Sequence, residues 1–327
     1  MKAICLISGG LDSILAAKTI LGQGVDIIGL NCKSQFCPRS KHKVEDMAKN
    51  LAIEFKGIDV TIDMLEIIKS PKHGFGSNIN PCIDCKIMML KKAKELMNIL
   101  EASFIVTGEV LGQRPMSQQR YTMSMIEKEA GLKGLIVRPL SAKLLDETIP
   151  EKNKWINRDA LFSISGRGRK EQIMLAEKLD IREYSWPAGG CLLTDPAFSK
   201  RLRDLIKNNP SPSPEDIELL KVGRHFRISN DAKLIVGRNE KENKQLLDFA
   251  KKDDFTFETV YVPGPVGLLI GSSLTDDILE LSASIITYYS DLKEKSTKIL
   301  VKNTYQNKEG LVEACPIFKE QIQIKII

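Results

Sequence analysis

Short apolar runs of strand length alternate with helix-length amphipathic stretches over roughly the first 150 residues. The runs that predict strands are 3–7, 25–30, 54–60, 104–107 and 135–137. The stretches between them that predict helices are 11–21, 41–51, 62–68 and 86–100. Alternation of this kind predicts an α/β fold with a doubly wound parallel sheet, in which ligands bind beyond the carboxyl ends of the strands.

A linker with three prolines, residues 208–214, separates this part from a second pattern. We expect a first domain over 1–208, mainly helical from about 143, and a smaller α/β domain over 215–327. In the second domain the pattern predicts strands at 222–228, 233–236, 256–262, 297–301 and 321–326, and helices at 240–250 and 274–290.

Composition narrows the class of protein. The chain has 327 residues, 43% of them hydrophobic, which is enough for a real core. Its net charge of +6 permits a nucleic-acid partner without requiring one. The part up to Lys200 carries 29 Lys and Arg and 23 Asp and Glu, whereas the rest carries 19 of each, so the whole basic excess lies in the first part.

Seven cysteines exclude a complete set of intrachain disulfides. No apolar stretch has the length of a membrane span, and Ser8-Gly9-Gly10 interrupts the N-terminal apolar run before a secretory signal is complete. We therefore expect a cytoplasmic protein with no membrane partner and with reduced thiols.

The segment Ser8-Gly9-Gly10-Leu11-Asp12-Ser13 lies between the first predicted strand and helix. Glycines there let backbone amides approach a phosphate, and the helix N-terminus adds partial positive charge. The two serines offer hydroxyl donors, and Asp12 is a candidate Mg²⁺ ligand and catalytic residue.

This segment resembles the SGGxDS signature of the PP-loop ATP pyrophosphatases, which have the adenine-nucleotide α-hydrolase fold. The resemblance implies that ATP is cleaved between its α and β phosphates and adenylates a carbonyl oxygen of the substrate. It also implies that the pyrophosphate end of ATP is held by Ser8, Gly9, Gly10, Asp12 and Ser13.

A second motif, Gly108-Glu109-Val110-Leu111-Gly112-Gln113 with Ser117-Gln118 after it, follows the strand predicted at 104–107. It resembles the GExLGQ…SQ segment of tRNA 4-thiouridine synthases, with one extra residue before Ser-Gln, and Arg138-Pro139-Leu140 resembles their RPL. Gly108 and Gln113 are the nucleotide-binding candidates here. Those synthases usually carry a tRNA-binding region ahead of the ATP motif, which here begins at Ser8. Several also carry a rhodanese domain, which this sequence does not show, so their usual route of sulfur delivery is in doubt.

Three cysteines are candidates for the sulfur chemistry. Cys82 and Cys85 form a Cys-x-x-Cys at the start of the helix predicted near Lys86, where the helix dipole lowers a thiol pKa, and Cys191 lies in a glycine-containing loop. The trio resembles the [4Fe-4S] ligands of some PP-loop thiolation enzymes. The residues alone leave two alternatives open, a persulfide pair of Cys85 and Cys191 and a structural zinc site. Cys32 and Cys37 match no motif, and Cys5 and Cys315 are expected to be structural.

Two basic segments, 33–43 and 163–170, are candidates for contacts with tRNA phosphates. Further along, Gly237-Arg238-Asn239 with Asn243, and Val262-Pro263-Gly264, resemble the RNA-binding domain of the NFACT protein group over about 215–327.

The leading hypothesis is therefore an ATP-dependent tRNA uridine thiolase that prefers 4-thiouridine to 2-thiouridine. Its cofactors would be ATP, Mg²⁺ and a [4Fe-4S] cluster. Its partners would be tRNA and a persulfide carrier or sulfide, with a homodimer also compatible. Two alternatives remain open: a PP-loop enzyme that forms amides or nitriles, and an RNA-binding protein whose ATP site only regulates.

Overall fold

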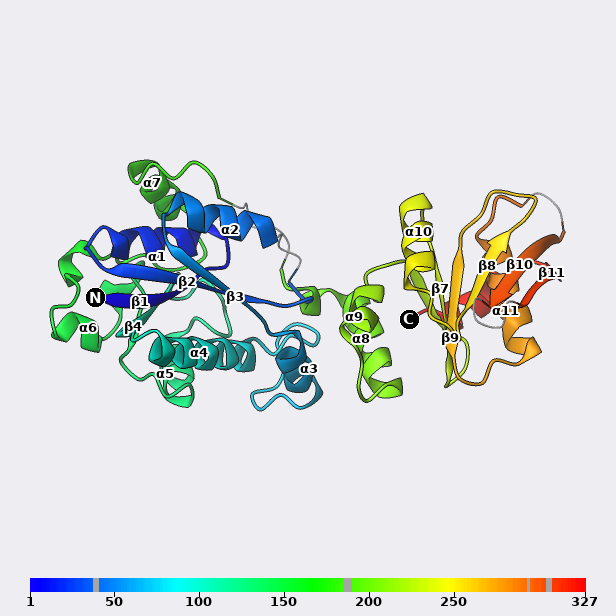
Figure 1. Ribbon diagram of the computed structural model, residues 1–327. Coiled ribbons are helices and arrows are strands. Elements are labelled where there is room, and N and C mark those ends of the chain that lie inside the picture. Colours follow the sequence, from blue (N-terminus) through cyan, green and yellow to red (C-terminus); the bar gives the residue numbers. More distant parts are fainter. Residues whose placement is uncertain (38–40, 185–189, 293–294, 304–307) are drawn as a thin grey trace. The chain divides into compact units, whose positions relative to one another are not determined.

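The computed structural model describes residues 1–37, 41–184, 190–292, 295–303 and 308–327. The chain divides into two compact units, Met1–Thr194 and Asp195–Ile327 (Figure 1). Within the described residues, every helix is too short or too polar to cross a membrane.

The first unit contains one parallel five-stranded sheet with the order β3-β2-β1-β4-β5. Its strands are β1 (Lys2–Leu6), β2 (Asp26–Lys33), β3 (Glu54–Asp59), β4 (Phe104–Thr107) and β5 (Ile136–Val137). The middle strand β1 is buried between two neighbours, with Ile4 paired to Ile28 on β2 and to Ile105 on β4. The predicted doubly wound parallel sheet is confirmed.

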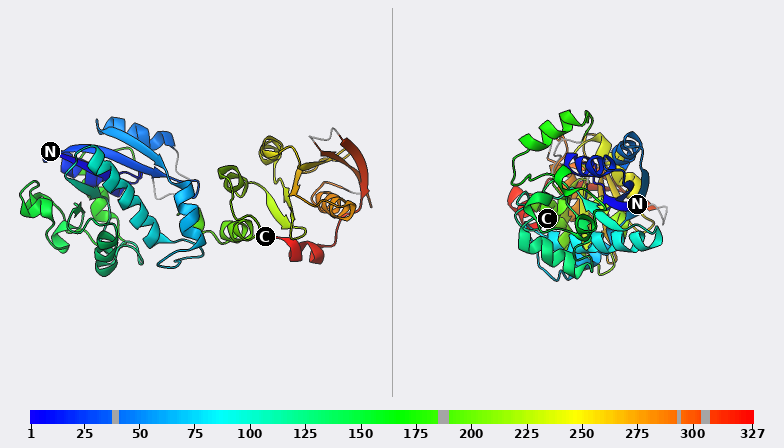
Figure 2. Two further views of the ribbon diagram at one scale, coloured as in Figure 1. Left: turned by 60° about the horizontal axis from the view of Figure 1, so that its bottom comes forward. Right: turned by 90° about the vertical axis from the view of Figure 1, so that its left-hand side faces the viewer.

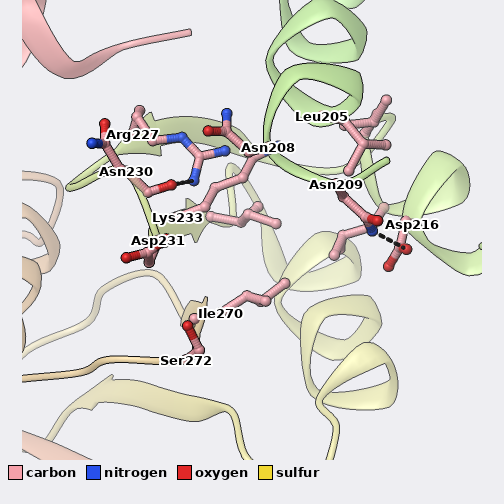
Figure 3. A pocket seen from close by; sticks show the side chains of 14 residues that line it. Leu205, Asn208, Asn209, Asp216, Arg227, Asn230, Asp231, Lys233, Ile270 and Ser272 are labelled. Atoms are coloured by element: carbon pink, nitrogen blue, oxygen red, sulfur yellow. Dashed lines mark hydrogen bonds between the residues drawn. The ribbon is translucent and has the colours of Figure 1, made fainter. Parts of the chain in front are cut away.

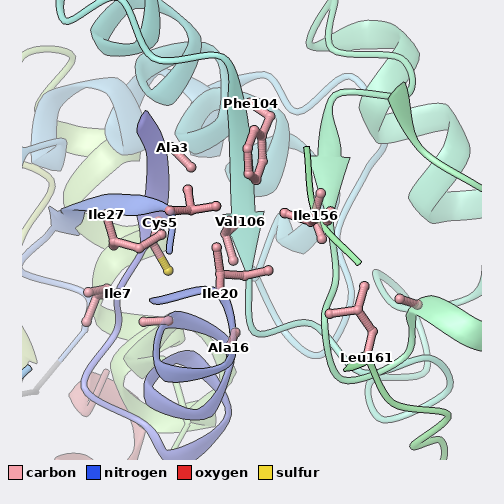
Figure 4. Packing of buried hydrophobic residues seen from close by; sticks show 14 of the residues in the cluster. Ala3, Cys5, Ile7, Ala16, Ile20, Ile27, Phe104, Val106, Ile156 and Leu161 are labelled. Carbon is pink, nitrogen blue, oxygen red and sulfur yellow. The ribbon is translucent and has the colours of Figure 1, made fainter. Parts of the chain in front are cut away.

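Helices cover both faces of this sheet (Figure 1). They are α1 (Leu11–Leu21), α2 (Lys41–Asn50), α3 (Thr61–Lys69), α4 (Cys82–Ile99), α5 (Arg120–Glu129), α6 (Ile149–Lys152) and α7 (Lys170–Lys178). On one face, Ala16 and Ile20 of α1 pack against Cys5 and Val106 of the sheet (Figure 4). On the other face, α4 and α5 pack their apolar side chains against Ile4 and Ile105.

The order of the strands fixes where a ligand can bind. The chain runs outward from β1 through β2 to β3 and then returns to add β4 on the other side of β1. The strand order therefore reverses at β1, and the loops that follow β1 and β4 meet at the carboxyl edge of the sheet, where ligands bind in folds of this class. Residues 8–10 and 108–113 are these two loops.

The second unit is built on a six-stranded antiparallel sheet with the order β11-β10-β8-β9-β7-β6. Its strands are β6 (Arg224–Arg227), β7 (Ala232–Val236), β8 (Phe255–Thr259), β9 (Gly267–Gly271), β10 (Thr297–Asn303) and β11 (Lys308–Ala314). Its helices are α8 (Pro196–Asn208), α9 (Pro214–Leu219), α10 (Glu240–Phe249), α11 (Asp276–Tyr288) and α12 (Lys319–Lys325). Apolar residues of α11 and α12 fill one face of the sheet, and those of α9 and α10 fill the other (Figure 2).

The division between the units falls at Thr194, ahead of the proline-rich stretch. Helix α8 belongs to the second unit, because Asp204 on α8 accepts a hydrogen bond of 2.9 Å from Nε of Arg227 on β6 and lies 3.7 Å from the ammonium of Lys233 on β7. The prolines separate α8 from α9, where Ser213 caps the helix and Pro214 occupies its first turn.

The C-terminal segment differs from its prediction. Residues 321–326 alternate in polarity and predict a strand, but 319–325 form helix α12. The edge of β10 is already paired with β11 along seven residues, and Ile322 is buried on α12 in the core of the second unit. Ile326 and Ile327 reach β6, through an isolated bridge to Phe226 and a hydrogen bond to the carbonyl of His225.

Candidate nucleotide and thiol site

The loop after β1 is shaped to receive an anion. Gly9 has a φ of +75°, and a Cβ there would lie 3.0 Å from Cγ2 of Val44, so glycine is required on both counts. The hydroxyl of Ser13 donates to the carbonyl of Gly10 at 2.8 Å and accepts from the amide of Ser8 at 3.3 Å. These bonds fix the loop at the N-terminus of α1, where the helix dipole and the first-turn amides favour negative charge.

The loop after β4 packs directly on this first loop. A Cβ at Gly108 would lie 2.5 Å from the carbonyl carbon and oxygen of Asp12 and 2.5 Å from the amide nitrogen of Ser13. Gln113 reaches across from the same loop, and its amide nitrogen donates to Oδ2 of Asp12 at 3.1 Å. The sequence candidates Gly108 and Gln113 thus lie against the phosphate-loop candidates.

Asp12 retains an acceptor that the surrounding protein does not use. Its Oδ1 is buried and forms no hydrogen bond with any residue that the structure describes. A buried carboxylate oxygen without a partner is costly, and a hard cation or its bound water would satisfy it. Asp12 therefore fits a Mg²⁺ ion bound together with a nucleotide.

A buried network of charged side chains lies next to the loop after β4. Glu109 lies 3.0 Å from Nε of Arg138 and 3.2 Å from the ammonium of Lys86, and Arg138 also donates to Glu127. Burial alone would raise the pKa of Glu109, but Lys86 and Arg138 outweigh it and hold that pKa at about 2. Glu109 is therefore ionised at neutral pH and joins β4 to the start of α4 and, through Arg138, to the segment after β5.

The thiols lie next to this network. Cys82 and Cys85 occupy the first turn of α4, immediately before Lys86, so the helix begins four residues earlier than the sequence predicts. Cys191 precedes a short 3-10 helix over Leu192–Thr194. Cys82, Cys85 and Cys191 are half-buried. Cys37, which matches no sequence motif, raises the pKa of each of these three thiols.

The expected lowering of the thiol pKa values is not found. Burial raises the pKa of Cys82, and it raises that of Cys85 to about 12 even though Lys86 acts in the opposite direction. The pKa of Cys191 is raised first by a hydrogen bond with the thiol of Cys37 and then by burial. Desolvation thus outweighs the favourable position at a helix N-terminus.

The thiols do not form a ready set of metal ligands. Across the ranges that the structure describes, no group of three or more Cys, His, Asp or Glu residues is placed to hold a metal ion. The predicted [4Fe-4S] cluster on Cys82, Cys85 and Cys191 stays a prediction. Of the remaining cysteines, Cys5 is buried in the core, and Cys315 is exposed in the second unit.

One basic segment lies beside the nucleotide loops. Ser165 forms an isolated parallel bridge with Leu111, and the amide of Gly166 donates to the carbonyl of Leu111 at 2.8 Å. The exposed Arg167 follows in the same segment. Residues 38–40 of the other basic segment lie outside the described residues, as do residues 185–189, which precede Cys191.

The polar residues of the other sequence motifs are largely structural. The amide of Gly112 donates to the carbonyl of Gln118 at 2.7 Å, which closes the loop after β4. In the second unit, the side chain of Asn239 caps α10, and Oδ1 of Asn243 accepts from the amide of Val266 at 3.1 Å. Arg238 is paired with Glu242 on the first turn of α10. The Gly-Arg-Asn motif therefore joins a strand to a helix.

The second unit also holds a pocket of about 210 Å³ between α8, α9 and the sheet (Figure 3). Its lining includes Asn208 and Asn209 from the end of α8 and Arg227, Asn230 and Lys233 from the β6–β7 region. Burial lowers the pKa of Lys233 to about 8, although Asp204 opposes that change. Acidic and apolar side chains, among them Asp216, Asp231 and Ile270, also line this pocket.

Two families match separate parts of the chain. Residues 1–157 match the model of the thiamine biosynthesis protein (ThiI) family, and residues 223–325 match the NFACT protein RNA binding domain. The first unit is similar to the ThiI family. The resemblances that the sequence motifs indicate are confirmed in both parts, and the ThiI-like unit contains the phosphate loop, the Gly108–Gln113 loop and the Cys-x-x-Cys.

Individual relatives point the same way. A probable tRNA sulfurtransferase of Methanocaldococcus jannaschii is 33% identical over 117 residues, which cover 34% of this chain and 30% of the relative. The tRNA-specific 2-thiouridylase MnmA 1 of Clostridium tetani is 25% identical over 346 residues, covering 99% of this chain and 88% of the relative. This chain spans less than a third of the length of the first tRNA sulfurtransferases that it matches. The crystal structure of a 4-thiouridine synthetase–RNA complex with bound ATP matches with a TM-score of 0.36 and 22% identity, over 55% of this chain and 51% of that one.

Proposed function

We propose that this chain is an ATP-dependent tRNA uridine thiolase that forms 4-thiouridine in preference to 2-thiouridine. The observation that carries the proposal is the convergence of two nucleotide loops, at residues 8–13 and 108–113, on a neighbouring group of thiols. The names of the matching relatives support transfer of sulfur to tRNA. The preference for 4-thiouridine rests on the resemblance of Gly108–Gln113 and Ser117-Gln118 to the GExLGQ…SQ segment.

ATP would be held by its pyrophosphate end on the loop after β1. Ser8, Gly9, Gly10 and Ser13 would bind it through backbone amides and hydroxyls, and Asp12, oriented by Gln113, would hold Mg²⁺. A Mg²⁺ ion bound there supplies positive charge against the phosphates. A uridine carbonyl oxygen attacks the α phosphate, pyrophosphate leaves, and the oxygen becomes part of an AMP leaving group.

Sulfur would come from the thiols of the first unit. Cys85 and Cys191 are the proposed catalytic thiols, one of which takes the outer sulfur of a persulfide carrier and becomes a persulfide, while the carrier leaves as a thiol. A [4Fe-4S] cluster on Cys82, Cys85 and Cys191 stays a prediction, and the proposal carries sulfur on cysteine.

tRNA would contact both units. The basic segment at 163–170 is bridged to the Gly108–Gln113 loop through Ser165 and Leu111, and it would hold phosphates near the nucleotide. The second unit carries no net charge of its own, since its sequence from Asp195 has as many acidic as basic residues, and would contribute mainly shape. The reaction is proposed for the cytoplasm, and a homodimer stays a prediction.

The proposal is tested by incubating the full chain with unmodified tRNA, ATP, Mg²⁺ and a persulfide donor. We expect pyrophosphate, AMP and a thionucleoside in equal amounts, with the thionucleoside identified by mass spectrometry of digested tRNA. 4-Thiouridine supports the full proposal, and 2-thiouridine would correct the position. Pyrophosphate release with no thionucleoside would refute sulfur transfer.

Asp12→Asn is expected to lower the rate of tRNA-dependent pyrophosphate release by at least about 100-fold, because it removes a Mg²⁺ ligand worth several kcal/mol. The amide keeps the shape of the side chain and can still accept from Gln113. The matched control is Asp26→Asn, at the exposed amino end of β2, where we expect the wild-type rate. Equal rates for the two variants would remove Asp12 from the catalytic site.

Arg167→Ala is expected to weaken tRNA binding for all sequences alike and to reduce the slope of log K against log salt by about one, the contribution of one phosphate contact. Binding is measured at several salt concentrations. Arg182→Ala, an exposed arginine after α7, serves as the control. An unchanged slope for Arg167→Ala would show that the segment beside Leu111 does not contact phosphate.

A further inference from the structure

We propose that Cys37, rather than Cys85, is the thiol that resolves a persulfide on Cys191, so that Cys37 and Cys191 end each turnover as a disulfide. This inference rests on the proposed thiolation and names the residue that releases the transferred sulfur from Cys191. It starts from the contact between the segments that carry Cys37 and Cys191, where the amide of Leu192 donates to the carbonyl of Phe36.

Cys37 and Cys191 lie beside each other, since the amide of Leu192 donates to the carbonyl of Phe36 at 2.9 Å, and a hydrogen bond with the Cys37 thiol raises the pKa of Cys191. Cys85 raises the pKa of Cys191 through its charge. Among the thiols near Cys191, Cys37 is therefore the one already within reach. A disulfide needs two sulfurs that approach without rearrangement of the backbone.

The backbone holds the two cysteines side by side. The amide of Leu192 donates to the carbonyl of Phe36 at 2.9 Å, which joins the residues adjacent to Cys191 and Cys37. Phe36 and Leu193 are fully buried and anchor the two segments. On the other side, the amide of Ile79 donates to the carbonyl of Leu193 at 3.3 Å.

Cys37 and Cys85, the two candidate partners of Cys191, differ in their exposure to solvent. Cys37 is exposed at a turn closed by its own amide and the carbonyl of Ser34, whereas Cys85 is half-buried in the first turn of α4. A disulfide formed in each cycle must be reduced by an external dithiol, which has to reach one of its sulfurs. Cys37 offers that access.

The proposed step is balanced as follows. The outer sulfur of the Cys191 persulfide loses its proton and attacks the adenylated carbon of uridine, and the C–O bond to AMP breaks. The Cys37 thiolate then attacks Sγ of Cys191 and breaks the S–S bond. The electron pair leaves with the sulfur on the base, which becomes a thiocarbonyl as the ring nitrogen takes up a proton. The transferred sulfur is reduced, the two cysteines are oxidised to a disulfide, and an external dithiol restores them.

The first experiment needs no activity. The reduced full-length protein is treated with one equivalent of diamide, digested without reductant and mapped by mass spectrometry. We expect a peptide pair linking Cys37 to Cys191. A predominant Cys85–Cys191 or Cys82–Cys85 link would overturn the pairing.

The second experiment uses a single turnover of persulfide-loaded protein with ATP and tRNA, without reductant. The wild type should release thiolated tRNA and gain the Cys37–Cys191 disulfide. Cys37→Ser should lose this release and instead hold tRNA on Cys191 as a covalent adduct that dithiothreitol frees as thiolated tRNA. Cys315→Ser, which removes an exposed thiol in the second unit, should behave as the wild type does.

The two failures can be told apart. Wild-type release by Cys37→Ser, with a disulfide at Cys85 and Cys191, would overturn the role of Cys37 and leave thiolation intact. Absence of thiolated tRNA from every variant would refute the proposed function, and the diamide map would still decide whether Cys37 pairs with Cys191. Serine is nearly isosteric at an exposed position, and an unchanged melting temperature confirms the fold of each variant.

Discussion

Gly108→Ala is expected to lower the rate of ATP cleavage about 100-fold or more. The added Cβ would lie 2.5 Å from the backbone carbon and oxygen of Asp12 and from the amide of Ser13, well inside van der Waals contact. Because all of these atoms are backbone, one loop must move by about 1 Å, and a displacement of that size at reacting groups costs on the order of 10²-fold in rate. The measurement is tRNA-dependent pyrophosphate release with saturating ATP.

Gly310→Ala is the control for this change. No heavy atom lies within 4 Å of a Cβ at Gly310, and its φ is not in the left-handed region, so alanine fits there without strain. We expect wild-type activity from this variant. If Gly108→Ala is as active and as stable as Gly310→Ala, then the close approach of the two loops is not needed for ATP cleavage.

Glu109→Gln is expected to destabilise the first unit by about 3–5 kcal/mol, because it leaves Lys86 and Arg138 next to a neutral group in a buried site. Thermal unfolding measures the change. The control is Glu54→Gln, which breaks an exposed pair with Lys56 and should cost no more than about 1 kcal/mol. Equal effects of the two substitutions would show that the buried network contributes no more than a surface pair.

The pKa of Glu109 predicts that the stability of the first unit depends on pH. The pKa of Glu109 is about 2 in the folded protein and about 4.3 in an unfolded chain, so the unfolded state binds more protons between these values. The stability that Glu109 provides is therefore complete above about pH 4.3 and is lost as the pH falls toward 2. The Glu109→Gln variant should lack this part of the acid dependence, and a parallel pH profile for wild type and variant would contradict the ionised state of Glu109.

The first sheet could be predicted because each of its buried strands is a continuous apolar run between turn residues, as in 3–7 and 104–107. The second sheet was harder. Strand β11 reads Lys-Glu-Gly-Leu-Val-Glu-Ala, carries three charged residues and a glycine without a regular alternation and lies at an edge, so its register with β10 comes from tertiary pairing and not from its own pattern. Strand β9 is short and flanked by glycines, and its five residues carry little signal alone.

The candidate site shows the same limit. The phosphate loop could be found because glycines, serines and Asp12 are contiguous in the sequence. Cys37 could not, because its contact with Cys191 joins segments 154 residues apart. One signal was available: Cys37 follows β2, which neighbours β1, and carboxyl ends of parallel strands meet at one edge of a sheet. The role of Lys86 likewise depends on the packing of α4 beneath β4.

The charges of Lys86, Glu109, Arg138 and Glu127 have a consequence for how this protein can change. Each charge is compensated by another from a different element, so losing one leaves its neighbour unpaired in the interior. Single substitutions at these positions should be deleterious, and paired ones far less so, a case of epistasis between residues up to 52 apart in the sequence. A substitution at one of these four positions should therefore be accompanied by a compensating substitution at another. The helix that bears the Cys-x-x-Cys and the loop that contacts Asp12 should change together.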